Sequence, residues 1–138
     1  MTPQLVAPSL TERFVDCVLC VRYAELPASL VTAFEVQGRL RLAATGMDTG
    51  SGFHKPGMTG IMGAVAAAVR LLGLDRKQAL MALGIAGSRA GSIANNTGSM
   101  TKSSHSGHAA RMGIECALLA QRGFTGTNDV FGPGGFFR

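Results

Sequence analysis

A lysine and two histidines lie close together in the chain between Asn95 and Arg111, in a stretch rich in Gly, Ser and Thr. These residues are Lys102, His105 and His108, which could bind an anion and transfer protons near neutral pH. We expect residues 98–107 to form a loop that opens onto a helix, whose free N–H groups and positive dipole end would face the same place. The pattern therefore indicates an anion site. A solvated loop with three unrelated polar residues also fits it, because helix starts are often rich in Ser and Gly.

Helices predicted from the spacing of apolar residues must position these side chains. The spacing and the turn residues predict helices over residues 10–24, 28–43, 57–72, 76–89 and 106–122. Capping-box spacings at Ser9–Glu12 and Asp75–Gln78 mark the starts of the first and the fourth helix. Residues 45–55 are predicted to form a loop that contains His54, just before Pro56. Because we find no alternating strand pattern and no internal repeat, the predicted fold is all-α, a bundle of about five helices.

The distribution of apolar residues predicts which surfaces are buried and which need a partner. On the second helix, helical spacing places one face on Leu30, Ala33, Phe34, Gln37 and Leu40. On the third helix, glycines and alanines form a smooth stripe that another helix could approach closely. Near the end of the chain, we expect Phe131, Phe136 and Phe137 to be exposed and to require a covering surface. Together with a charged content of only 15%, this predicts self-association or contact with further parts of a longer protein.

Charge and composition restrict the class of partner. Thirteen Lys and Arg against eight Asp and Glu give a net charge of +5, which favours an acidic partner. The basic residues are scattered, with no run of four and no interleaved aromatic residues, so we do not expect nucleic-acid binding. A small polyanionic ligand needs only two or three converging cations and fits this pattern better.

Cysteine usage and motif searches indicate neither a metal nor a cofactor. Cys17, Cys20 and Cys116 are an odd set without a second C-x-x-C, so we expect neither disulfides nor a zinc site. The Cys17–Cys20 pair has the spacing of a redox-active motif but lies in a helical apolar pattern, which favours buried structural thiols. We find no phosphate loop, no dinucleotide fingerprint and no cluster of metal ligands. We also find no secretory signal, and the apolar run of the third helix contains Arg70 and is too short to span a membrane. The expected location is the cytoplasm.

Five segments, in this order along the chain, resemble the MmgE/PrpD family. They are G-F-H at 52–54, G-I-M-G-A-V-A-A-A-V-R-L-L-G-L-D at 60–75, A-L-G-I-A-G-S-R-A-G at 82–91, G-S-M-T-K-S-S-H-S-G-H-A-A-R-M-G at 98–113 and L-L-A-Q-R-G-F-T-G at 118–126. This family includes 2-methylcitrate dehydratase, cis-aconitate decarboxylase and iminodisuccinate epimerase. The resemblance implies part of a helical domain of a cytoplasmic, metal-independent lyase or isomerase that acts on small di- and tricarboxylates.

The resemblance also implies which residues lie in the active site. His54 would be an acid-base group, Lys102 a clamp for a carboxylate, and His105 a second group that handles protons. The remaining candidates for substrate binding are the neighbouring Thr101, Ser104 and His108. Three departures from the family pattern stand out: Lys55-Pro56 replaces a proline that directly follows the histidine, Ser103-Ser104 replaces Pro-Leu, and His108 replaces an arginine or asparagine.

Family members are several times longer than this chain, so we expect it to be an internal fragment of the helical domain. Residues 1–28 would form an N-terminal helical region, and residues 29–138 a partial MmgE/PrpD helical domain. The expected function is that of a 2-methylcitrate dehydratase-like segment, whose activity depends on missing parts or on a partner chain. The expected partners are a small di- or tricarboxylate and either a second copy of the chain or the missing family parts. The alternative is a catalytically inert helical fragment or interaction module.

Overall fold

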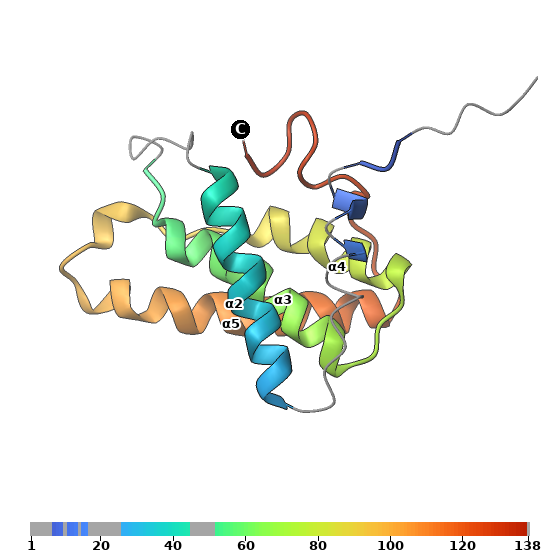
Figure 1. Ribbon diagram of the computed structural model, residues 1–138. Helices are drawn as coiled ribbons and strands as arrows, with labels where there is room; N and C mark the ends of the chain where they lie inside the picture. The colour runs from blue at the N-terminus through green and yellow to red at the C-terminus, as the bar shows by residue number, and fades with distance from the viewer. Residues whose placement is uncertain (1–6, 10, 14, 17–25, 45–51, 138) are drawn as a thin grey trace, which may run out of the picture.

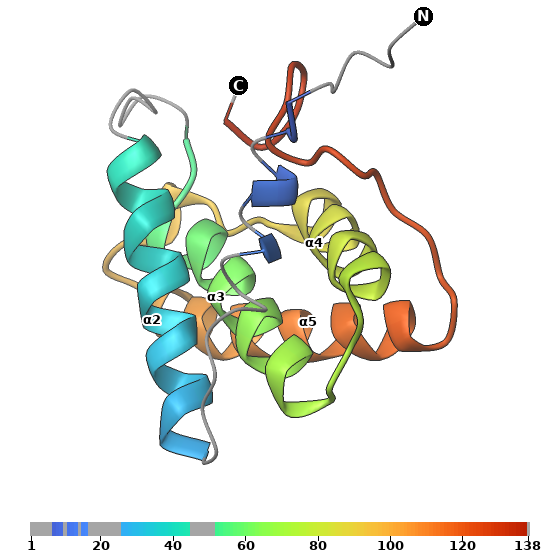
Figure 2. The same cartoon turned by 45° about the vertical axis from the view of Figure 1, so that its right-hand side comes forward.

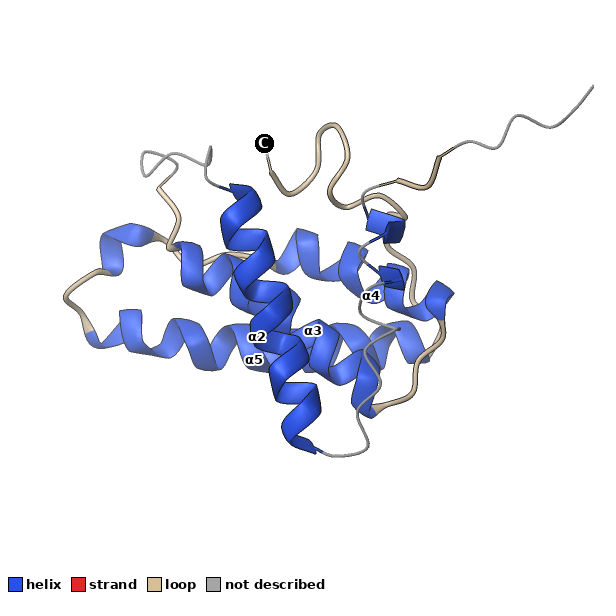
Figure 3. Ribbon diagram, in the orientation of Figure 1, coloured by secondary structure: helices blue, strands red, loops and turns tan. Residues whose placement is uncertain are grey.

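The computed structural model describes residues 7–9, 11–13, 15–16, 26–44 and 52–137 (Figure 1). Its helices are α2 (Leu26–Ala43), α3 (Lys55–Leu71), α4 (Arg76–Arg89) and α5 (Met100–Gln121), with a short 3-10 turn η3 (Ala94–Asn96) before α5. Residues 11–13 and 15–16 are also helical. Within these ranges no residue belongs to a strand, and helices and loops make up the ribbon (Figure 3). The all-α prediction is confirmed.

Helix α3 lies at the centre of the arrangement. It contacts α2, α4 and α5, and Figures 1 and 2 show α2 crossing α3. The largest fully buried side chains of α3 are Ile61, Met62, Val65 and Val69, at the helical spacing predicted from the sequence. This central helix therefore supplies the core, and the other helices pack around it.

Glycines allow the helices to approach α3 closely. A Cβ on Gly113 of α5 would lie 2.8 Å from the backbone nitrogen of Val65, and a Cβ on Gly63 of α3 would lie 2.6 Å from the carbonyl oxygen of Ala33. Neither contact is possible for a larger residue without movement of a backbone. The smooth stripe predicted on the third helix is thus used for packing.

Local signals predicted the start and end of α4 correctly. Asp75 accepts a hydrogen bond from the Gln78 N–H at 2.8 Å, and the Gln78 side chain accepts one from the Asp75 N–H at 3.1 Å. The same reciprocal pair joins Ser9 and Glu12, at 2.9 and 3.2 Å. Both predicted capping boxes are confirmed. Cys17, Cys20 and most of the predicted first helix lie outside the described residues.

The apolar face that helical spacing gives the second helix is only partly buried. Apart from Leu40, which is buried as expected, the buried positions of α2 include Ser29, Thr32 and Val36, whereas Phe34 is 74% exposed. Burial of Thr32 is possible because its hydroxyl donates a hydrogen bond to the Ala28 carbonyl at 3.0 Å. The buried side of this helix therefore runs through Ser29, Thr32, Val36 and Leu40.

The phenylalanines of the C-terminal segment are not exposed, which corrects a second prediction. Phe131 and Phe136 are buried, and the ring of Phe131 lies 6.2 Å from that of Phe136 and 5.4 Å from that of Phe137. The N–H of Phe131 donates to the Thr11 hydroxyl at 3.1 Å, and that hydroxyl donates to Asp129 at 2.8 Å. Contacts with a segment some 120 positions earlier bury this tail, and no pattern along the tail itself could have revealed them.

Candidate active site

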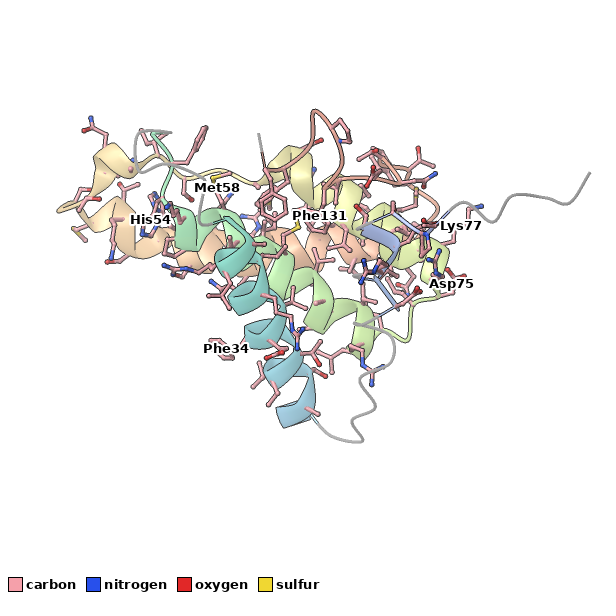
Figure 4. The ribbon with its side chains drawn as sticks, turned by 45° about the horizontal axis from the view of Figure 1, so that its top comes forward. Phe34, His54, Met58, Asp75, Lys77 and Phe131 are labelled. Atoms are coloured by element: carbon pink, nitrogen blue, oxygen red, sulfur yellow. The ribbon has the colours of Figure 1, made fainter. Side chains whose placement is uncertain are left out.

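His54 lies at the N-terminal end of α3, where its backbone is fixed on both sides. Its N–H donates to the Ser92 carbonyl at 2.7 Å, and its own carbonyl accepts from the N–H groups of Gly57 and Met58 at 2.9 and 3.2 Å. Helix α3 begins at Lys55, two residues before the predicted start, because a proline is tolerated in the first helical turn. Figure 4 shows His54 at this end of α3, beside the start of α5. The half-buried imidazole is thus held on a rigid support.

A second backbone segment lies behind His54 and orients it. Phe53 and Ile93 form an isolated antiparallel bridge, and the Ala94 N–H donates to the Gly52 carbonyl at 2.8 Å. Ser92, which directly precedes Ile93, has a φ of 90°, which is unusual for a residue other than glycine. The sequence analysis did not select Ser92, because nothing in the sequence distinguishes it from other loop serines.

His105 meets His54 from the neighbouring helix. The two Nδ1 atoms are 3.1 Å apart, and the ring centroids lie 5.1 Å apart at an interplanar angle of 48°. His105 is only 6% exposed and lies one and a half turns into α5. The fold thus brings together two of the proposed site residues, although 51 positions separate them in the chain.

Two positively charged side chains act on His54 in addition to His105. Burial lowers the pKa of His54 below its ordinary value, and the nearby His105, Lys102 and Arg41 lower that pKa further, in this order of influence. Lys102 lies one turn before His105 in α5, and Arg41 lies in the last turn of α2. Positive charge from two further helices therefore converges on His54. Arg41 was not among the predicted site residues, because it is distant in sequence from both motifs.

The predicted loop at residues 98–107 is wrong, because α5 begins at Met100 and its cap is Ser99. Lys102, His105 and His108 are therefore helical residues, with His105 facing inward and the other two exposed. The buried positions of α5, which include His105, Ala109, Gly113 and Cys116, follow a helical spacing. Packing of this stripe against α3 outweighs the low helix propensity of Ser, Thr and Gly.

The remaining candidates surround the first turns of α5. Thr101, Ser104 and His108 are exposed, and the Ser104 hydroxyl donates to the Thr101 carbonyl at 2.7 Å. Ser99 is the N-cap residue of α5, and no side chain accepts a hydrogen bond from the first N–H groups of the helix. These N–H groups could therefore bind an anion near Lys102. The structure therefore places the six predicted residues in one region, at the meeting of the N-terminal ends of α3 and α5.

Comparison with known proteins decides the family. The model of the MmgE/PrpD N-terminal domain matches residues 11–138. The chain belongs to the MmgE/PrpD family. Human cis-aconitate decarboxylase is 43% identical over 97 residues, which are 70% of this chain and 20% of the relative. The mouse protein of the same name is 38% identical over 104 residues, 75% of this chain and 21% of the relative.

A fungal relative gives the same coverage. The cis-aconitate decarboxylase-like protein oryM of Aspergillus oryzae is 38% identical over 105 residues, 75% of this chain and 22% of the relative. This MmgE/PrpD chain thus spans about a fifth of the length of the curated relatives that it matches. The described part of the chain contains no helix that is long and apolar enough to cross a membrane. Nor do the described residues contain three His, Cys, Asp or Glu side chains grouped as metal ligands.

Proposed function

We propose that this chain supplies part of the active site of an MmgE/PrpD enzyme that acts on a small di- or tricarboxylate. The observation that carries the proposal is the contact between His54 and His105, with Lys102 one helical turn away. Two imidazoles and a cation on the rigid ends of two helices can hold a carboxylate and transfer a proton beside it.

Each residue would have a distinct role. Lys102 and the uncapped N–H groups of α5 would bind a carboxylate, which keeps the adjacent carbon near the histidines. His54 would act as acid-base group, since its lowered pKa keeps it neutral and able to accept a proton at neutral pH. His105 would transfer the second proton, and Thr101, Ser104 and His108 would contact the outer part of the substrate. No step assigned to these residues requires a metal or a cofactor.

The names of the relatives favour cis-aconitate or a close analogue as substrate. Dehydration of a 2-methylcitrate-like acid and decarboxylation of cis-aconitate both require a proton to move at a carbon next to a carboxylate, so the same groups can serve either reaction. We propose that activity requires further parts of the family fold or a partner chain, since this chain spans a fifth of the relatives' length. The cytoplasmic location and the division near residue 28 stay predictions.

A titration of the purified chain tests the proposal. We expect cis-aconitate or 2-methylcitrate to bind saturably by calorimetry, and Lys102→Ala to weaken binding about tenfold or more, because it removes a charge-assisted contact. The matched control is Lys77→Ala, since Lys77 is an exposed lysine on α4, far from His54 in Figure 4. Equal loss in both variants would indicate non-specific charge attraction. Absence of binding to the folded chain would overturn the proposal and favour the inert helical module.

An exposed apolar groove supports a second role, in association. The groove has a volume of about 670 Å³ and lies between α2 and α5, with α3 as its floor. Its lining includes Leu30, Phe34, Gly60, Ala64, Ile114 and Leu118, and no charged residue of the described chain lines it.

We propose that a second copy of the chain covers this groove. Phe34 projects from α2 at its edge (Figure 4), so one face carries both a protruding ring and a slot. Such a self-complementary face is what a two-fold symmetric dimer requires.

A further inference from the structure

The contact between His54 and His105 constrains where the protons of both rings can lie. Two Nδ1 atoms 3.1 Å apart are at hydrogen-bonding distance, and such a contact needs one proton between them. If both Nδ1 atoms were bare, two lone pairs would face each other. If both carried protons, two N–H groups would collide.

We infer that the two histidines share one Nδ1 proton and are thereby fixed in opposite tautomers when both are neutral. The ring that donates from Nδ1 then has a bare Nε2, which is a base. The ring that accepts at Nδ1 carries its proton on Nε2, which is an acid. This inference deepens the proposed function, because one contact would supply both the acid and the base.

The paired rings can pass a proton from one Nε2 to the other. The bare Nε2 of the first ring takes a proton from the substrate carbon, and the shared Nδ1 proton moves to the second ring. The second ring then gives its Nε2 proton to the leaving hydroxyl, which departs as water while the electron pair of the broken C–H bond forms the new double bond. The pair then returns to neutrality with its tautomers exchanged.

Among the residues that the structure describes, the surroundings of His54 support pairing between the rings rather than with a carboxylate. Besides His105 itself, the charged groups of the described residues that lower the pKa of His54 are Lys102 from α5 and Arg41 from α2, both cations. Residues 90–99, which include the segment bonded behind His54, contain no acidic or basic side chain. His105 is buried, so bulk water has little access to compete for its Nδ1. The partner ring is therefore the group that sets the tautomer of each histidine.

Nuclear magnetic resonance of the imidazole nitrogens tests this inference directly, since the chain has just three histidines. In the free protein at about pH 8, where imidazoles are neutral, we expect His54 and His105 to show opposite tautomers. His108 is exposed and should show the averaged pattern of a solvated histidine. The same tautomer on both His54 and His105 would overturn the inference.

Substitution of one histidine at a time tests whether the other ring depends on it for its tautomer. In His105→Phe, which keeps a ring but has no atom that can share a proton, His54 should lose its fixed tautomer, and in His54→Phe the same should hold for His105. His108→Asn is the control and should leave both signals unchanged. If one variant does not fold, the other still gives the answer, and an unaltered tautomer in a folded variant would contradict the shared proton. Because no substrate is added, this result does not depend on whether a carboxylate binds.

Discussion

Gly57 lies against Ser92 so closely that a Cβ on Gly57 would come within 2.7 Å of the Ser92 Cβ. This contact joins the first turn of α3 to the segment that binds the His54 backbone. We expect Gly57→Ala to displace Ser92 and to lower the free energy of unfolding by about 1–3 kcal/mol, as overpacking typically does. Urea denaturation measures the change. The displacement should also alter the imidazole signals of His54, because the backbone N–H of His54 donates a hydrogen bond to the Ser92 carbonyl.

A glycine in open space is the control for that substitution. Gly107 is exposed in α5, and a Cβ there would meet no atom within 4 Å. Gly107→Ala should therefore raise the free energy of unfolding by about 0.5–1 kcal/mol, because alanine loses less backbone entropy than glycine in a helix. Destabilisation by both substitutions would contradict the packing argument.

Ser92 should be more stable as glycine. Its φ of 90° strains any residue with a Cβ, and such strain costs about 1–3 kcal/mol. Part of the gain is offset by the greater freedom of glycine in the unfolded chain, so we expect Ser92→Gly to stabilise the protein by about 1 kcal/mol. The shift in the urea midpoint measures it. Ser106→Gly, in the regular part of α5, should instead destabilise by about 0.5 kcal/mol.

Stability should fall as the pH is lowered from about the ordinary histidine pKa of 6.5. The pKa of His54 is lower in the folded than in the unfolded protein, so between these two values the unfolded chain binds more protons and protonation favours unfolding. The carboxyls of Glu12 and Glu115, whose pKa values are lowered from 4.5, act only at more acidic pH. Urea denaturation between about pH 8 and pH 5 measures the slope.

Substitution of His54 assigns that pH dependence. His54→Asn should flatten the slope, because it removes the group whose pKa is lowered in the folded protein. A slope that survives in His54→Asn would show that another group titrates.

Self-association through the groove predicts a dimer that a single charge disrupts. Phe34→Glu should give a monomer by analytical ultracentrifugation, because a carboxylate in an apolar interface loses its hydration without gaining a partner. The control is Phe124→Glu: Phe124 is 57% exposed and is not among the residues that line the groove. This variant should stay dimeric. A wild-type chain that sediments as a monomer at high concentration would exclude the second copy as occupant.

The sequence by itself determined the features that depend on neighbouring residues. The limits of α4 and the capping boxes at Ser9 and Asp75 were predicted correctly, because a cap is satisfied within three residues of itself. The apolar spacing of α3 likewise predicted its buried face. The ordered motifs around His54 and Lys102 were specific enough to indicate the family that the comparison then showed.

Only the tertiary structure decided the features that depend on distant residues. Packing on α3 extends α5 back to Met100 and buries His105, against the local preference of a Ser- and Gly-rich stretch for a loop. The contact of Phe131 with Thr11 covers a tail that appeared exposed. The pairing of His54 with His105 requires two helix ends, 51 positions apart, to meet with both Nδ1 atoms in register. Helix packing sets that geometry, and residue spacing along the chain contains no information about it.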